Sequence, residues 1–185
     1  SGLPAGRTVV LELRSEPGLI THYLEAEEAT VSSIEGGLRA LMPGLRLTPE
    51  KLMSERRFGS GRAIRLAHGG GSLRTDDFEA SAATLLGSLT GLAEGEAVAV
   101  RWTLAGATAA AVKDPKAHGK ARFERYHHLR GKNRNRMLKA RGFILGTAAS
   151  RARAREILDP VALTMRSRYT PHGELTFQPL PRFLL

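Results

Sequence analysis

The stretch AVAVRWTLA, residues 97–105, places a large apolar side chain at every second position. Val98, Val100, Trp102 and Leu104 therefore share one face of an extended segment, which predicts a β-strand with that face turned towards a core. Trp102 is the single tryptophan of the chain. Because it lies in register with the apolar face, we predict a core residue rather than a ligand platform.

The residues before this strand predict an amphipathic helix over residues 76–92. Thr75 suits the N-cap, and Asp76 and Asp77 suit the first turn, where the helix dipole favours negative charge. This position also explains the two aspartates better than acid-base catalysis does. The apolar stripe repeats at helical spacing and consists of Phe78, Ala82, Leu85, Leu86, Leu89 and Leu92.

The N-terminal part of the chain predicts a hairpin followed by a helix and a further strand. Residues 7–14 and 19–24 are rich in β-formers and flank the turn sequence Glu16-Pro17-Gly18. Helical spacing of apolar residues predicts a helix over residues 27–42 that ends at Pro43-Gly44. Two more strands are predicted, a short edge strand at residues 45–47 and a longer strand at residues 62–66.

The C-terminal part predicts one β-α-β unit. Residues 143–148 predict a strand, and Ser150 suits the N-cap of the helix that follows. Pro160 interrupts the helical pattern, because proline lacks the N–H and its ring clashes with the preceding turn. We therefore expect a kink or two short helices there. Residues 174–178 predict the last strand.

This order of elements predicts an α+β fold of ferredoxin-like type. Split β-α-β units would form a mostly antiparallel sheet with helices on one face. We divide the chain into an α+β core over residues 1–112, a basic connecting segment over residues 113–141 and a β-α-β unit over residues 142–185. The last unit either completes the sheet as a duplicated β-α-β unit or forms a second, smaller subdomain, and the sequence leaves this open.

The basic segment carries most of the net charge. Residues 113–141 hold eleven of the 28 Lys and Arg and two of the 18 acidic residues, which gives +9 of the formal +10. Such a local excess is typical of a segment that binds a polyanion. The candidate nucleic-acid-binding residues are Lys116, Lys120, Arg122, Arg125, Tyr126, Arg130, Lys132, Arg134, Arg136, Lys139 and Arg141.

Two other uses of this segment stay open. Phe123, Tyr126 and Leu129 share one face of a short predicted helix and could dock the segment onto its own domain, whereas Phe123 or Tyr126 could stack on a base. The segment could also be a solvated, disordered connection whose charge keeps it soluble. Where its cations meet phosphates, we expect affinity with weak sequence discrimination.

Signals for catalysis, metals and cofactors are missing from the sequence. The chain has no cysteine, its six histidines form no HExxH pattern, and its serines lie in no GxSxG elbow. The glycines at 69–71 lack the lysine of a Walker motif. We therefore expect no cofactor, no metal and no enzymatic activity in this chain. Without an apolar run long enough for a bilayer or a signal peptide, we expect a cytoplasmic location.

A broader pattern covers most of the chain. Its parts are TVVLELR, IEGGLRALMPGLRL, LRTDDFEASAATLLGSLTGLAEGE, AVAVRWTLAG, then a variable connection, RMLKARGFILGTAAS and the Ala/Arg-rich RARAREIL. This pattern resembles the accessory region that precedes the motor in conjugative ATPases of type IV secretion-like systems, the coupling-protein family. The start at Ser1-Gly2, without methionine, also suggests a piece of a longer protein.

The resemblance implies an accessory domain of a membrane-attached, DNA-translocating ATPase on the cytoplasmic side. Its partners would be DNA, the motor domain of the parent chain, other secretion-system subunits and further copies of itself. No catalytic residue carries over, because no motor motif is present. Two alternatives from other classes remain, a free-standing nucleic-acid-binding protein that uses residues 113–141 and a structural interaction domain with a disordered basic loop.

Overall fold

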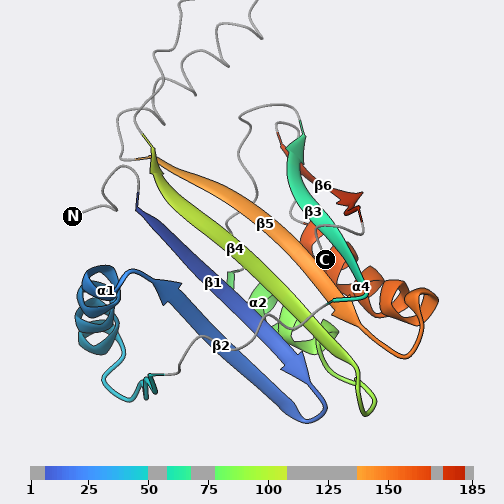
Figure 1. Ribbon diagram of the computed structural model, residues 1–185, viewed down its shortest axis with the longest axis horizontal. Coiled ribbons are helices and arrows are strands. Elements are labelled where there is room, and N and C mark those ends of the chain that lie inside the picture. Colours follow the sequence, from blue (N-terminus) through green and yellow to red (C-terminus); the bar gives the residue numbers. More distant parts are fainter. Residues whose placement is uncertain (1–6, 50–57, 68–77, 108–136, 168–172, 182–185) are drawn as a thin grey trace, which may run out of the picture.

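The computed structural model describes residues 7–49, 58–67, 78–107, 137–167 and 173–181. The described strands form one six-stranded sheet in the order β2-β1-β4-β5-β3-β6, and all neighbours are antiparallel (Figure 1). The predicted α+β class and antiparallel sheet are thus confirmed. The strands are β1 (Thr8–Glu16), β2 (Leu19–Ala26), β3 (Ser60–Ala67), β4 (Ala97–Ala107), β5 (Met137–Thr147) and β6 (Glu174–Pro179).

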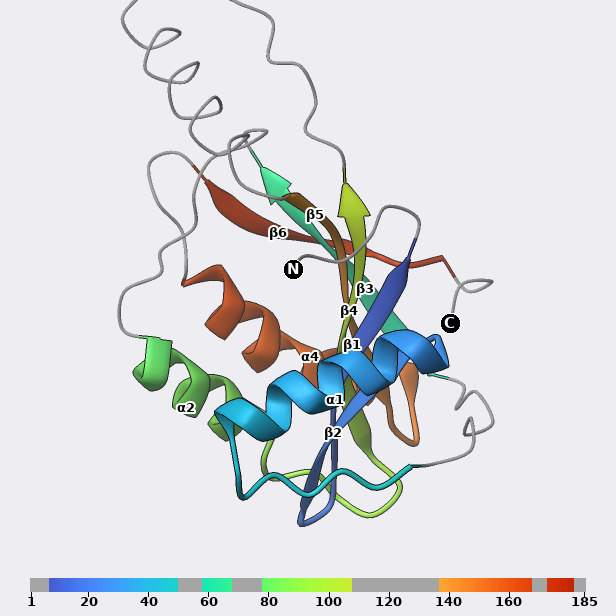
Figure 2. The same ribbon diagram turned by 90° about the vertical axis from the view of Figure 1, so that its left-hand side faces the viewer.

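Two of the three described helices cover one face of this sheet. Figure 2, which views the sheet from its β2 edge, shows α2 (Phe78–Ser88) and α4 (Arg151–Arg166) on the same side. Helix α1 (Glu28–Leu41) follows β2 and lies beside that edge strand. The prediction of helices on one face therefore describes α2 and α4, whereas α1 flanks the edge. The opposite side of the sheet carries a smaller buried cluster of Phe58, Ala63, Ala99, Leu145 and Leu180, and we call it the open face because neither α2 nor α4 covers it.

The main core lies between the sheet and the helices α2 and α4. It forms because alternate residues of each strand point to the same side. Val98, Val100 and Ile144 of the central strands are almost fully buried there, as are Leu158 and Val161 of α4. Trp102 packs against this core, as predicted from its register in β4.

Local chemistry explains the ends of the elements. Gly18 has a φ of 71°, a left-handed conformation that glycine adopts without steric cost, and it closes the tight β1–β2 hairpin. The backbone N–H of Arg153 donates to the Ser150 Oγ at 3.1 Å, which confirms the predicted N-cap of α4. Helix α2 ends at Ser88, earlier than predicted. The Ser88 Oγ donates to the Leu85 carbonyl, a local bond that competes with further helix.

Two predictions about elements are wrong. Residues 45–47 form no strand, because helix α1 flanks the β2 edge and no described strand pairs with them. Of the two outcomes expected at Pro160, a kink or two short helices, the second is wrong, since α4 is one continuous helix with Pro160 inside it. The exposed Pro160 lies between the buried Leu158 and Val161, whose packing holds the helix together through the proline.

Candidate nucleic-acid interface

Strand β5 begins six residues earlier than predicted and takes in the end of the basic segment. The sequence predicted the strand at residues 143–148, but β5 starts at Met137, which pairs with Ala107 at the end of β4. Lys139 and Arg141 are therefore strand residues rather than part of a connection. The chain leaves β4 and returns to β5 at the same end of the sheet.

Two of the eleven predicted nucleic-acid-binding residues belong to the described part of the chain. Lys139 pairs with Ala105 and Arg141 with Thr103 across β4, and both side chains are exposed. The remaining nine lie outside the described residues, as do Phe123 and Leu129. These nine are Lys116, Lys120, Arg122, Arg125, Tyr126, Arg130, Lys132, Arg134 and Arg136.

The register of β5 decides which way its cations point. Ile144 lies in the core beneath the helices, so Gly142, Ala140 and Leu138 share that side of the strand. Lys139, Arg141 and Phe143 alternate with them and face the open side. Such alternation of apolar and cationic residues is typical of a half-buried strand.

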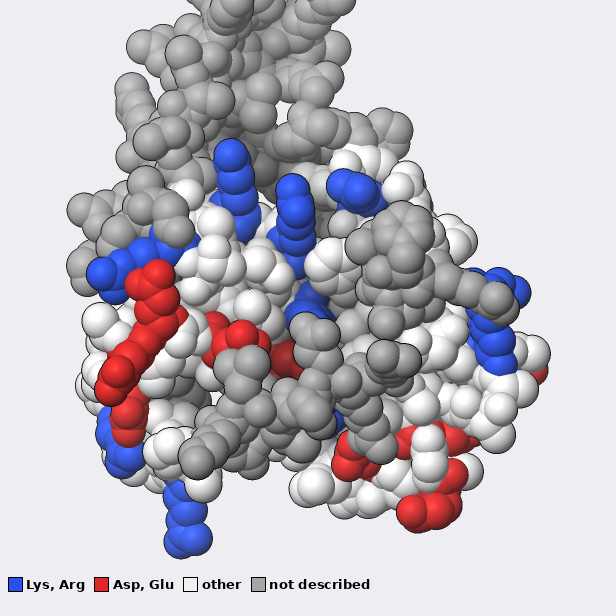
Figure 3. Space-filling model, viewed as in Figure 1, with Lys and Arg blue, Asp and Glu red and all other residues white. Residues whose placement is uncertain are grey.

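Arg65 of β3 extends the cationic patch to a third strand. Ala63 pairs with Phe143 and Ile64 with Gly142, where the pairing of β3 with β5 ends, and Arg65 and Arg141 are the next residues of the two strands. Neighbouring strands are about 5 Å apart, and residues two apart along a strand are about 7 Å apart. Arg65, Lys139 and Arg141 thus lie on the same side and at the same end of the sheet, and we call them the cationic patch. Figure 3 shows Lys and Arg side chains gathered over this end of the face.

The three cations of the patch are exposed and have no acidic partner among the described residues. The other arginines of the sheet differ, because Arg62 pairs with Asp159 of α4 and Arg101 pairs with Glu12. Exposed cations close together repel one another, and a bound polyanion relieves that repulsion. The patch is therefore suited to bind phosphate groups.

Next to the patch, a buried carboxylate holds two arginines in place. Glu12 of β1 is 5% exposed and accepts from the Arg14 Nε at 2.8 Å and from the Arg101 Nε at 2.6 Å. The Arg14 guanidinium also lies 4.7 Å from the centre of the Tyr23 ring, a cation–π contact. Glu12 offsets one of the two positive charges and fixes the orientation of both arginines.

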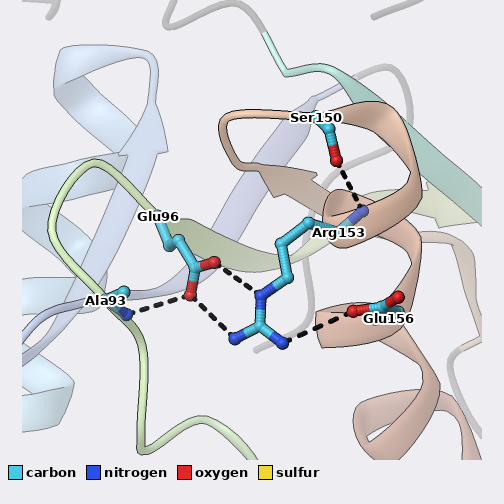
Figure 4. Close-up of polar contacts among 5 residues, drawn as sticks. All are labelled: Ala93, Glu96, Ser150, Arg153 and Glu156. Atoms are coloured by element: carbon cyan, nitrogen blue, oxygen red, sulfur yellow. Dashed lines mark hydrogen bonds and ion pairs between the residues drawn. The ribbon is translucent and has the colours of Figure 1, made fainter.

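A second charged cluster joins helix α4 to the start of β4 (Figure 4). Glu96 accepts from the Arg153 Nε at 2.7 Å and from the Ala93 backbone N–H at 2.9 Å, and Arg153 also pairs with Glu156 at 3.5 Å. The hydrogen bond from Arg153 is the largest cause that lowers the pKa of Glu96 below its ordinary value. All these groups are satisfied within the fold, so the cluster is a structural clamp.

An apolar pocket lies where α1 meets the sheet. It has a volume of about 280 Å³ and is lined by the aliphatic side chains Val9, Leu11, Leu24, Ile34, Leu38, Leu104 and Leu138. The strand residues among them share the side of the sheet that carries α2 and α4. No titratable group lines this pocket, so it offers no acid-base chemistry.

Sequence reasoning missed Arg65, Arg101 and Phe143 as members of the open face. Their positions follow from pairings between distant segments, such as Arg101 with Glu12 and with Phe143. The alternation in RAIRLA and MLKARGF was the available signal, because it separates the cations from the apolar face.

The remaining features that could indicate a function are metal sites, membrane-spanning helices and similarity to known proteins. Within the described ranges, no group of three His, Asp or Glu side chains is arranged to hold a metal ion. No helix in those ranges has the length and apolar character needed to cross a membrane. Comparison with models of protein families, with curated proteins and with solved structures found no match.

Proposed function

We propose that this chain is an accessory domain that binds nucleic acid, DNA in the first place, through the open face of its sheet. One observation carries the proposal: Arg65, Lys139 and Arg141 are exposed at the same end of the open face and have no acidic partner among the described residues. Phosphate contacts from such a patch give affinity without reading sequence.

The position of the patch along the chain supports the same function. The patch lies at the end of the sheet where β4 ends and β5 begins, and residues 108–136 connect these two ends. That connection contains nine Lys and Arg and two acidic residues. A polyanion bound to the patch would therefore meet further positive charge close by.

For the parent protein, we propose a conjugative, type IV secretion-like DNA-translocating ATPase. The support is the sequence pattern from TVVLELR to RARAREIL. In this proposal the domain does no chemistry of its own and engages DNA, or secretion-system partners, for the motor. A Walker motif encoded after Leu185 in the gene is the expected finding. A stop codon at that point would contradict the motor and leave a free-standing nucleic-acid-binding protein.

We also propose a ferredoxin-like arrangement for the unit β3-α2-β4-β5-α4-β6. Its strands follow the order β6-β3-β5-β4, in which β5 separates β3 from β4 and β3 separates β5 from β6. Each half is thus a split β-α-β unit. The duplication predicted for the C-terminal unit would correspond to these two halves of one sheet, with the β1–β2 hairpin added at the β4 edge.

The salt dependence of DNA binding tests the interface. Labelled duplex and single-stranded DNA are titrated at several salt concentrations with the wild type and with the variant R65Q/K139Q/R141Q. If each cation neutralises one phosphate, the slope of log K against log salt should become flatter by about 2 to 3 units.

The matched control is R46Q/R151Q/R155Q, which removes the same charge from the segment after α1 and from α4. Its slope should stay close to that of the wild type. No binding by the wild type at low salt, or an equal slope for all three proteins, would reject the open face as the interface.

A further inference from the structure

We infer that the open face takes a single strand rather than a duplex, with one base stacked on Phe143 and the neighbouring phosphates on the cationic patch. This inference rests on the proposed function and specifies its substrate. The observation behind this inference is the position of Phe143, which the strand register places between Arg101 and Arg141 on the open face.

Phe143 lies between cations on the open face. Arg101 is directly opposite it on β4, and Arg141 lies two residues before it on the same side of β5. Ala63 is opposite Phe143 on β3, and Arg65, two residues further along β3, faces the same side of the sheet. Phe143 is half-buried and packs against a buried apolar cluster that consists of Phe58, Ala63, Ala99, Leu145 and Leu180.

The residues beside Phe143 on this face form a packed apolar cluster, and Phe143 lies at its margin. Ala63 and Ala99 are only 8% and 0% exposed, because they belong to this cluster together with Phe58, Leu145 and Leu180, whereas Phe143 keeps part of its surface exposed. Stacking of bases on aromatic side chains is sequence-tolerant, because every base presents a π-face. In this inference the exposed part of Phe143 provides the stacking surface.

Glu12 prepares Arg101 for this role. The Arg101 Nε is bound to the Glu12 Oε2, and the Arg101 side chain remains 39% exposed. Because a buried partner fixes its orientation, Arg101 loses less freedom when it meets a phosphate or the face of a base. Arg14, in contrast, is 11% exposed and lies against Tyr23, so that ring is already covered.

The form of this site favours an unpaired strand. In a duplex the bases are stacked inside the helix, and a sheet face that meets it contacts mainly phosphates. A ring set among cations can contact a base only when the strand is single and its bases are free to turn towards the protein. Cations alone, without an aromatic ring, would bind the phosphates of a single strand and of a duplex alike.

The test compares a 20-nucleotide oligothymidine, its RNA counterpart and a duplex of the same length, with Phe143→Leu as the variant. Leucine keeps most of the apolar volume but removes the π-face. We expect F143L to weaken single-strand binding by about 5-fold or more, within the ~5- to 100-fold that loss of one stacked base corresponds to. The salt slope and duplex binding should stay unchanged, because the cations remain.

Phe177→Leu is the matched control, since Phe177 of β6 packs against the main core on the other side of the sheet. It should leave all affinities unchanged. Should F143L fail to fold, the ring signals of Phe143 in the wild type replace it. Oligothymidine should shift these signals through base ring currents, and the duplex should not.

The outcomes separate this inference from the proposed function. Duplex binding as tight as single-strand binding, or an equal loss for F143L on both, overturns the single-strand inference and leaves the open face as a DNA interface. No binding of any nucleic acid overturns both. Stronger binding of either the DNA or the RNA strand supports the inference and identifies the preferred sugar.

Discussion

Gly142 shows how one missing side chain decides the packing of two strands. A Cβ at this position would lie 2.6 Å from the Trp102 Cζ3 and 2.8 Å from the Ile64 Cδ1. Trp102 pairs with Gly142 across β4 and β5, so its ring lies over the glycine on the core side. The tryptophan predicted from its register to be a core residue therefore depends on a glycine in the neighbouring strand.

We expect Gly142→Ala to destabilise the fold by about 1–3 kcal/mol, the usual cost of adding atoms to a packed core. Urea unfolding of the variant and the wild type measures this loss. Gly36→Ala is the control, because Gly36 lies inside α1 and an added methyl group there would meet no neighbouring atom within 4 Å. At that position alanine should stabilise the helix by up to about 1 kcal/mol. Equal stability of G142A and wild type would contradict the packing argument.

Glu96 makes one part of the stability depend on pH. Because the hydrogen bond from Arg153 lowers its pKa in the folded protein, the carboxylate stabilises the fold above the unfolded pKa. This contribution disappears as the pH falls through the folded pKa. We expect Glu96→Gln to be less stable than wild type at neutral pH, with the difference shrinking in acid. Chemical unfolding of both proteins from about pH 7 down to about pH 3 measures it, and a constant difference would contradict the role of ionised Glu96.

At the level of elements, the described helices differ in how firmly they are held. Helix α4 buries Ala154, Ile157, Leu158, Val161 and Ala162, whereas α1 buries Thr30 alone. The last residue of α1, Leu41, is 81% exposed. Helix α1 is therefore attached mainly through the margin of the aliphatic pocket and through Arg7, which donates to the Thr30 Oγ1 at 2.9 Å.

Hydrogen exchange tests this difference. Backbone amides in the middle of α1 should exchange through local opening and be at least about tenfold less protected than those of α4, whose opening requires the core to open. Amides of β4, the central strand next to β5, provide the reference for global unfolding. Equal protection of α1 and α4 would mean that α1 is part of the main cooperative unit.

Strand β5 shows what the sequence could and could not predict about elements. Its second half was predicted from FILGTA, a run of strand-forming residues. Its first half was assigned to the basic segment because of the charge of Lys139 and Arg141, although these cations alternate with Leu138 and Ala140. The number of charges in a segment depends only on its composition, whereas the side of a strand on which they lie depends on the two-residue alternation of the sequence. In this segment the alternation indicates a strand more reliably than the charge indicates a connection.

At the scale of the whole molecule, local patterns predicted most elements but not the order of the strands. Alternation and helical spacing are local, so β1, β2, β3, β4 and α1 were found close to their true bounds. The order β2-β1-β4-β5-β3-β6 depends on pairings between distant segments, such as Arg101 with Glu12 across 89 residues. For this reason the sequence does not predict which cations share the open face, although it contains each of them.

The whole molecule offers two sources of positive charge, and their contributions can be separated. Replacing residues 113–136 by a Gly/Ser linker of equal length removes nine cations and two acids, a change of −7, but keeps Lys139 and Arg141 in β5. If the open face binds on its own, this variant should still bind single-stranded DNA, more weakly and with a residual salt slope of about 2 from the three cations of the patch.

The linker variant is therefore compared with the same protein carrying R65Q/K139Q/R141Q. The combined variant should lose the remaining salt-dependent binding, because neither source of charge is left, while circular dichroism should show the same fold for both proteins. Loss of all binding in the linker variant alone would assign the whole interaction to residues 113–136. A residual slope that survives in the combined variant would place the phosphates elsewhere on the molecule. The intermediate result, in which each change removes part of the slope, is expected because the connection leaves and re-enters the sheet beside the patch, so one strand can contact both.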